Sequence, residues 1–547
     1  MSRVGRTRVL TAVATVALLF IAGCGRSADE DDNQNNNVSE DTKLTTITPA
    51  GTSEAGPITW TVYRDVQTLD PIYAFDYPDN TAVSLMCESL LRMQPDGQIA
   101  DGLAKMSQPD DSTLVFDIDP AATFWDGNKV TAEDVVFSLK RQTDPNLGGF
   151  YGATFSRVDS IEATGDEQVT VKLKEPDAWL QGELASFPGI ILEKSFTEAQ
   201  GAKYGTPDGS IMCTGAYKLK SWEPATGVVA EANTDYWGST GAPKTSEIVL
   251  KGAPDEAAFT NSLTTGEIQG SYVFALSTLK QLEDSDKVNV VQGPGYSTDA
   301  FVISNLDGAL GDLKVRQALS MAIDRQGIID TVYKGAALMP RWFSNPGTFG
   351  YGVSTFQDAY DATDPMSQDI DKAKELVKEA GAEGKTVTIG MSSELANISA
   401  VASEYQTAGK AIGLDVKLKS VSANNYINFF IDPKARASVD GFLTVNYGDY
   451  ADPAALLATI VLPDGSQNFS GYSDAETTKL MNQARSEMDP DKRAEIMVKV
   501  EERITEQLPW IPNVQPTTVL ILNKEFSGAV SSFAYMFAPW ANQLGGS

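Results

Sequence analysis

The sequence predicts a mixed α/β protein of at least two lobes. The chain has 547 residues, which is more than one hydrophobic core usually organises. Hydrophobic residues make up 42% of it, as expected for a globular protein. From residue 58 onward, short segments rich in β-branched and aromatic residues are interspersed with longer segments of helical periodicity. That mixed order favours α/β lobes over a β-sandwich or a helical bundle.

The first 23 residues have the features of a secretory signal. Three arginines within the first eight positions precede an apolar run at 9–20, and small residues lead into Cys24. This pattern resembles the cleavage box of bacterial lipoproteins, in which the cysteine becomes the acylated N-terminus. We therefore expect residues 1–23 to be removed and the protein to be anchored by lipid at Cys24 to the extracytoplasmic face of the cell membrane. The alternative is an ordinary secretory signal that contains a cysteine.

Residues 24–57 have the composition of a flexible, acidic tether. They are mostly Asp, Glu, Asn, Ser, Thr and Gly, with an acidic run at 29–32 and three asparagines at 35–37. Such a segment buries too little apolar surface to offset the entropy lost on ordering. The apolar run at 9–20 is also too short for an ordinary transmembrane helix. A lipid anchor, a polar tether and a large domain together are the layout of a cell-surface protein.

The composition excludes several classes of function. The formal net charge is −30, and the loss of three positive charges with the signal makes it −33, which disfavours nucleic acid as a partner. The chain has no histidine, which excludes Ser-His-Asp and Cys-His nucleophile systems, HExxH zinc sites and histidine-ligated haem. We expect no metal, no cofactor and no catalytic residue, although hydrolysis by two carboxylates stays open on composition.

The three cysteines suggest one disulfide. With Cys24 lipidated, Cys87 and Cys213 remain as an even pair in an oxidising compartment. Closing so long a loop stabilises the fold by roughly 4–5 kcal/mol in the chain-entropy description. The alternative is two separate buried thiols.

The elements follow from local pattern in chain order. Strands are expected where β-branched and aromatic residues cluster, and helices where apolar residues recur at helical spacing. Thr131 is a good N-cap with acidic residues in the following turn, and Gly381 is a helix stop. The expected strands are 58–63, 114–118, 169–173, 247–251, 387–390 and 414–418. The expected helices are 81–92, 131–141, 313–334, 370–380, 400–411 and 475–507, the last broken at 489–490.

Several blocks of sequence resemble one known family. The run ATFWDGNKVTAEDVVFSLKR at 122–141 closely resembles the F-x-D-G-x-x-x-T-A-x-D-V-x-F-S signature of extracellular solute-binding proteins of family 5. The family's other blocks follow in order: LDP at 69–71, CTGAYKL at 213–219, VRQALSMAIDR at 315–325 and YGDYADP at 447–453. The resemblance extends from residue 58 to the C-terminus. Each block also has a purely structural interpretation, so the blocks identify a family without locating its site.

The resemblance implies a specific architecture. It is the two-lobe fold of the periplasmic binding proteins, in the large peptide-binder class, with an extra subdomain inserted in lobe 1. On this basis lobe 1 covers 58–300, including an inserted subdomain at about 92–180. Lobe 2 covers 301–511, and 512–547 return to lobe 1. The segments that cross between the lobes are expected near 298–304 and 511–519.

The resemblance also implies site residues. In peptide-binding members an aspartate at the place of Asp449 pairs with the α-ammonium of the peptide, while the alternative is that Asp449 caps a local turn. Phe75, Asp76 and Tyr77 follow the LDP turn where members contact the ligand backbone, and Tyr447 occupies a position often filled by tryptophan. For these four, packing without ligand contact is an equal alternative.

One departure from the family concerns the negative end of a peptide. Oligopeptide binders carry an arginine six residues before the aspartate, and this chain has Leu443 there. Lys434 and Arg436 lie nearby in sequence and do not fill the position. Capture of a short peptide at both ends is therefore in doubt.

The leading hypothesis is a non-catalytic, lipid-anchored, monomeric receptor that binds a peptide or peptide-like solute and delivers it to the permease subunits of an ABC transporter. Two alternatives stay open. One is a cell-surface glycoside hydrolase that uses two carboxylates, and the other is a sensor or adhesin on the same scaffold.

Overall fold

A seven-stranded sheet organises the first lobe of the structure, a computed structural model that describes residues 43–224, 226–253, 255–272 and 276–547. Its central strand β1 (Ile58–Val62) runs parallel to both neighbours, and the outer strands pair antiparallel. Trp60 of β1 is completely buried. The strand order is β12 (Val288–Gly293), β19 (Thr518–Asn523), β11 (Gly270–Tyr272), β1, β10 (Glu247–Gly252), β9 (Gly227–Ala232) and β8 (Tyr217–Glu223).

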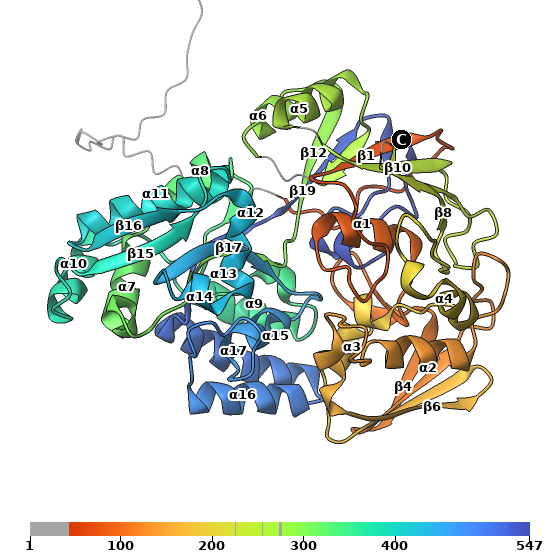
Figure 1. The fold of residues 1–547 in the computed structure, drawn as a ribbon, viewed down its shortest axis with the longest axis horizontal. Helices are drawn as coiled ribbons and strands as arrows, with labels where there is room; N and C mark the ends of the chain where they lie inside the picture. The colour runs from red at the N-terminus through yellow and green to blue at the C-terminus, as the bar shows by residue number, and fades with distance from the viewer. Residues whose placement is uncertain (1–42, 225, 254, 273–275) are drawn as a thin grey trace, which may run out of the picture. The chain divides into compact units, whose positions relative to one another are not determined.

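A six-stranded sheet organises the second lobe. Helices α7 (Leu313–Ala322), α10 (Ile370–Glu379) and α11 (Ala396–Ala411) lie beside it and share a separate hydrophobic core with it (Figure 1). The strand order is β14 (Ala337–Leu338), β18 (Trp510–Pro516), β13 (Ser297–Ile303), β17 (Gly441–Tyr447), β15 (Thr386–Met391) and β16 (Asp415–Ser420).

The chain passes between these two sheets twice. Strand β12 of the first sheet leads into β13 of the second through residues 294–296, and β18 of the second leads into β19 of the first through Thr517. Both crossings are therefore short and extended. The final residues after β19 pack within the first lobe.

A four-stranded antiparallel sheet belongs to the chain between β1 and β8. Helix α2 (Ala132–Arg141) packs on this sheet and begins with a complete capping box, in which Thr131 and Asp134 exchange side-chain to backbone hydrogen bonds. The capping role expected for Thr131 is thus confirmed. The strand order is β4 (Ala104–Asp110), β5 (Thr113–Ile118), β7 (Gln168–Leu173) and β6 (Val158–Gly165).

The remaining elements include α17 (Pro490–Gln507), a long helix with a buried face, and α1 (Tyr77–Met86), which is almost entirely buried. The other helices are α3 (Leu180–Glu183), α4 (Lys194–Gln200), α5 (Glu256–Thr265), α6 (Leu279–Glu283), α8 (Arg325–Thr331), α9 (Val353–Ala362), α12 (Ala423–Tyr426), α13 (Asn428–Ile431), α14 (Pro433–Arg436), α15 (Pro453–Val461) and α16 (Ala475–Ser486). The strands are β2 (Leu91–Met93), β3 (Ile99–Asp101), β20 (Phe526–Ser527) and β21 (Gly545–Gly546). No helix in the described part of the chain is long and apolar enough to span a bilayer.

Two predicted helices differ from those observed in a way that an aspartate cap explains. The helix expected over 81–92 is α1, which begins four residues earlier because Asp76 caps it, and 91–93 form a strand instead. The helix expected over 313–334 is two helices, because Ile323 is extended and the side chain of Asp324 accepts a hydrogen bond from the N–H of Gly327 at 2.8 Å. In both cases an aspartate cap that periodicity does not reveal sets where a helix begins.

The tether prediction is wrong for residues 43–57. This segment packs along the C-terminal part of the chain, where Ser53 pairs with Gly546 in an isolated bridge. The hydroxyl of Thr48 is buried and donates to the carbonyl of Ala529 at 3.1 Å. The signal, Cys24 and the rest of the tether lie outside the described residues.

Cys87 and Cys213 form a disulfide with their Cα atoms 4.9 Å apart. Both cysteines are buried in the first core. The bond joins the end of α1 to the segment before β8, across 126 residues of sequence.

Candidate functional site

A cavity of about 280 Å³ lies where the chain crosses between the two sheets, and we call it the interlobe cavity. The first lobe contributes Tyr77 and Tyr272 to its wall, and the second lobe contributes Tyr333 and Val445. The crossing itself, at 516–519, also lines it. The cavity is therefore bounded by both lobes and by a segment that connects them.

Aromatic rings form one wall of the interlobe cavity. The rings of Tyr272 and Tyr535 are stacked, with centroids 3.4 Å apart and planes inclined by 12°. Tyr77 and Phe533 meet edge to face at 5.8 Å. Tyr447 lies at 5.4 Å from the rings of both Tyr77 and Phe533. Because Tyr447 ends β17, it brings the second lobe against the aromatic wall of the first.

Tyr447 also bonds to the loop before α1. Its hydroxyl donates a hydrogen bond to the carbonyl oxygen of Phe75. The side chain of Phe75 is 51% exposed and meets the ring of Phe150 at 4.6 Å. The structure thus brings Phe75, Tyr77 and Tyr447 together.

Asp76 is engaged within the protein. Its carboxylate caps α1 and accepts hydrogen bonds from Tyr63 and from Arg64, the latter at 2.6 Å. Arg64 also pairs with Asp79 at 2.9 Å. The charge of Asp76 is therefore already balanced at the edge of the site.

Asp449 lies in the loop between β17 and α15, two residues after Tyr447. Its side chain is half-buried and has no hydrogen bond or ion pair within the described part of the chain. Burial raises the pKa of Asp449 to about 6, because the carboxylate loses hydration without gaining a partner. The cap of α15 is Asp452, which accepts from the N–H of Ala454 at 2.7 Å, so Asp449 is left without that structural task.

Glu183 is a second carboxyl group beside Asp449, and the sequence analysis missed it. Burial and the negative charge of Asp449 raise the pKa of Glu183 to about 8. Its carboxyl group accepts a hydrogen bond from the hydroxyl of Thr154 at 3.3 Å. Helix α3 approaches so closely that a Cβ on Gly182 would lie 2.2 Å from the ring of Tyr450. No sequence motif identifies Glu183, because only the packing of α3 against Tyr450 brings it near Asp449.

Leu443 cannot replace the arginine of oligopeptide binders. It is completely buried in the second core, where it pairs with Phe301 of β13. Arg436 lies over the ring of Phe469 at 4.4 Å and donates to the carbonyl of Phe430 at 2.7 Å. Among the described residues, none that lines the interlobe cavity is cationic.

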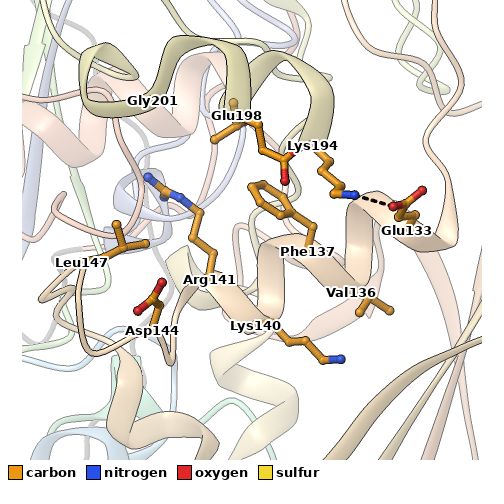
Figure 2. Close-up of a pocket in the computed structure, with 11 residues that line it drawn as sticks. Glu133, Val136, Phe137, Lys140, Arg141, Asp144, Leu147, Lys194, Glu198 and Gly201 are labelled. Atoms are coloured by element: carbon orange, nitrogen blue, oxygen red, sulfur yellow. Dashed lines mark hydrogen bonds and ion pairs between the residues drawn. The ribbon is translucent and has the colours of Figure 1, made fainter.

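A larger hollow of about 490 Å³ lies between α2 and α4 in the first lobe. Figure 2 shows the ring of Phe137 pointing from α2 toward α4, with Lys194 bonded to Glu133 at one end. At the other end Arg141 is held by Asp70 through hydrogen bonds of 2.6 and 2.8 Å. Lys194 and Arg141 are thus paired within the protein, and this hollow shares no lining residue with the interlobe cavity.

The described residues hold no group of three or more Cys, Asp or Glu side chains arranged to bind a metal ion. The arrangement at the interlobe cavity suits binding instead. It offers an aromatic wall, and Tyr447, whose ring packs against that wall, lies two residues before the unpaired Asp449.

Known proteins match almost the whole described chain. The periplasmic oligopeptide-binding protein OppA of Salmonella typhimurium is 26% identical over 476 residues, which cover 82% of this chain and 85% of OppA. The dipeptide-binding protein DppE of Bacillus subtilis is 24% identical over 499 residues, covering 87% and 90% of the two chains.

Solved structures share the fold. The ABC transporter substrate-binding protein CtaP of Listeria monocytogenes superposes with a TM-score of 0.78 at 24% identity, covering 90% of this chain and 99% of CtaP. DppA of Helicobacter pylori, in complex with the peptide STSA, has a TM-score of 0.75 at 23% identity and covers 90% and 99%. The fold is therefore the two-lobe fold of the peptide-binding class of periplasmic binding proteins.

Residues 98–468 match the description of bacterial extracellular solute-binding proteins, family 5 Middle. That match covers most of the chain and includes β17 and the loop that carries Asp449. The chain belongs to the bacterial extracellular solute-binding proteins of family 5.

Proposed function

We propose that this protein is the solute receptor of an ABC importer and that it encloses a peptide or peptide-like solute in the interlobe cavity. Relatives over more than four fifths of the chain are named as oligopeptide- and dipeptide-binding proteins, which supports a peptide as the solute. A protein of the same fold is named in complex with nickel and histidine, so a small chelate is the other solute class to test.

The observation that carries this proposal is the unpaired carboxylate of Asp449. A half-buried charge without a partner is costly in the free protein, and a ligand ammonium removes that cost by pairing with it. At a separation of about 4 Å and an effective dielectric constant near 20, the attraction is of order 4 kcal/mol before desolvation. Asp449 therefore seats the positive end of the solute.

The remaining site residues are proposed to act around this seat. Tyr77 lines the cavity, and Tyr447 packs against the ring of Tyr77 and donates to the carbonyl of Phe75 in the loop before α1. Asp76 keeps its place by capping α1, so its role is to position that loop. The protein has no enzymatic step in this proposal, and the solute leaves unchanged.

Export and anchoring complete the proposal. The basic start, apolar run and Cys24 support a lipid anchor on the extracytoplasmic face of the cell membrane, and the acidic segment after Cys24 supports a tether. The receptor would then act as a monomer and deliver its solute to the permease. Loss of the membrane fraction on Cys24→Ser, measured by cell fractionation, tests the anchor.

Native mass spectrometry of the purified protein tests the solute class, because a tight ligand is retained and its mass is read directly. Calorimetry then compares Asp449→Asn with the wild type. We expect at least a tenfold loss of affinity for peptides with a free α-ammonium. Asp464→Asn is the matched control, since it removes the same charge from an exposed position in the second lobe. Equal affinities of the wild type and Asp449→Asn would refute this assignment.

The same experiments separate the alternatives. A hydrolase that used the two carboxyl groups, Asp449 and Glu183, would release products, whereas a receptor returns the ligand with its mass unchanged. A sensor or adhesin would leave solute accumulation intact when the protein is deleted from the cell, whereas a transport receptor would not.

A further inference from the structure

The interlobe cavity has an uncharged lining, and this bears on the solute beyond its positive end. Among the described residues that line it, none is an Asp, Glu, Lys or Arg. Tyrosines supply much of the wall, together with aliphatic side chains such as Leu276 and Val445. A charged side chain placed here would lose hydration without meeting an opposite charge.

The charges behind the wall are neutralised or bonded within the protein. The hydroxyl of Tyr333 donates to Asp299 at 2.6 Å, and Asp299 also accepts from Asn513 at 2.9 Å. On the other side, Asp76 is paired with Arg64 at 2.6 Å. Asp76 is therefore balanced by a cation, and both carboxylate oxygens of Asp299 are engaged by donors of the protein.

Several rings of the wall are engaged with one another. Tyr272 and Tyr535 use a face of each ring to stack on the other, and Tyr77 is held edge to face against Phe533. A cage for cations needs open ring faces, and stacking takes up one face of Tyr272 and one of Tyr535. By contrast, another aromatic ring packs well in edge-to-face or offset contact with such a wall.

Two tyrosine hydroxyls remain available to a solute. Tyr77 and Tyr535 have no hydrogen-bond partner for the hydroxyl within the described residues, and neither oxygen is sealed from solvent. Burial raises the pKa of both phenols, so they stay protonated and can donate. They can therefore meet carbonyl oxygens of a bound backbone without any charge.

The volume of the interlobe cavity is sufficient for an aromatic ring. An apolar cavity of roughly 150 Å³ holds benzene, and the interlobe cavity has about 280 Å³. We propose that this cavity selects solutes that carry an uncharged aromatic side chain, with the positive end of the solute outside it at Asp449. This inference rests on the proposed function for its peptide framework and adds the class of side chain.

Calorimetry of the ligand-free protein with four homotripeptides tests the inference: triphenylalanine, trialanine, trilysine and triglutamate. Identical side chains at all three positions make the result independent of which one enters the cavity. We expect triphenylalanine to bind at least tenfold more tightly than trialanine, and the two charged tripeptides to bind more weakly than trialanine. Equal affinity for triphenylalanine and trialanine, or tightest binding of trilysine, would overturn the proposal.

Val445→Asp places a charge in the cavity and should lower the affinity for triphenylalanine at least tenfold. Thr444→Asp is the matched control, because neighbouring strand residues point to opposite faces and Thr444 does not line the cavity. If Val445→Asp does not fold, the double variant Tyr77→Phe and Tyr535→Phe removes both donors at nearly constant volume, and threefold or greater weakening is expected. Unchanged affinity for triphenylalanine in whichever variant folds would contradict binding of an aromatic side chain in the interlobe cavity.

Two small probes separate failure of this inference from failure of the peptide assignment. If no tripeptide binds, the peptide assignment fails, and binding of indole or tetramethylammonium is measured by NMR. Binding of indole alone sustains the preference for a neutral ring. Binding of tetramethylammonium, or of neither probe, overturns it.

Discussion

The affinity for a cationic solute should depend on pH through Asp449. With its pKa near 6, this carboxyl group is about 97% ionised at pH 7.5 and only about 10% ionised at pH 5. Only the ionised form attracts an ammonium group, so the affinity should fall about tenfold over that range, or about 1.4 kcal/mol. The solute's own amine, with an ordinary pKa near 8, is still about three quarters protonated at pH 7.5 and almost fully protonated at pH 5.

The groups around Asp449 modify this profile without reversing it. Tyr447 and Tyr151 have pKa values raised well above their ordinary value by burial and by the charge of Asp449, so they remain neutral. Glu183, with its pKa near 8, is mostly protonated at pH 7. A bound ammonium favours its ionised form, so binding near neutral pH should release protons.

Calorimetry between pH 5 and 7.5 measures the affinity, and repetition in two buffers of different ionisation enthalpy measures the protons released. Asp449→Asn should flatten the profile over this range, while Asp464→Asn should keep the slope of the wild type. A flat profile in the wild type, or the same slope in Asp449→Asn, would refute the role of this carboxylate.

The remaining predictions concern stability and geometry. Asp449→Asn should stabilise the ligand-free protein at pH 7, with an upper limit of ~3 kcal/mol for a pKa raised from 3.8 to about 6, as measured by urea unfolding. The variant gains stability because a carboxyl group with a raised pKa makes the native state lose stability as the pH rises from about 4 to about 6. If Asp449→Asn is no more stable than the wild type at pH 7, the carboxylate is better solvated than its burial implies. Reduction of the Cys87–Cys213 disulfide should lower the free energy of unfolding by about 5 kcal/mol, since the bond closes a loop of 126 residues, and Cys87→Ser should show the same loss without reductant. Gly182→Ala should displace α3 from the ring of Tyr450 and weaken the electrostatic coupling between Glu183 and Asp449. Fewer protons should then be released when the solute binds. Unchanged proton release would show that the close approach of α3 does not position Glu183.

Many elements of this fold could be predicted from the sequence because their signals are local. The capping box at Thr131 depends on residues three positions apart, and the break at 489–490 depends on an aspartate cap followed by proline. Where a cap was overlooked, as at Asp324, the predicted helix ran too long.

Residues 43–57 show why composition alone can mislead. Their polar side chains bury little apolar surface, which correctly predicts that they cannot fold alone. They are nevertheless ordered, because the C-terminal segment supplies backbone partners that are almost 500 residues away in sequence.

The sequence by itself determined the mixed α/β elements, the family-like blocks and Asp449 as the candidate for a positive group. Only the tertiary structure decided that Glu183 lies beside Asp449, that Leu443 is buried and that the cavity wall is uncharged. The physical reason is that burial and electrostatic coupling depend on which distant segments share a space. Helical periodicity, strand alternation and capping depend only on near neighbours in the chain.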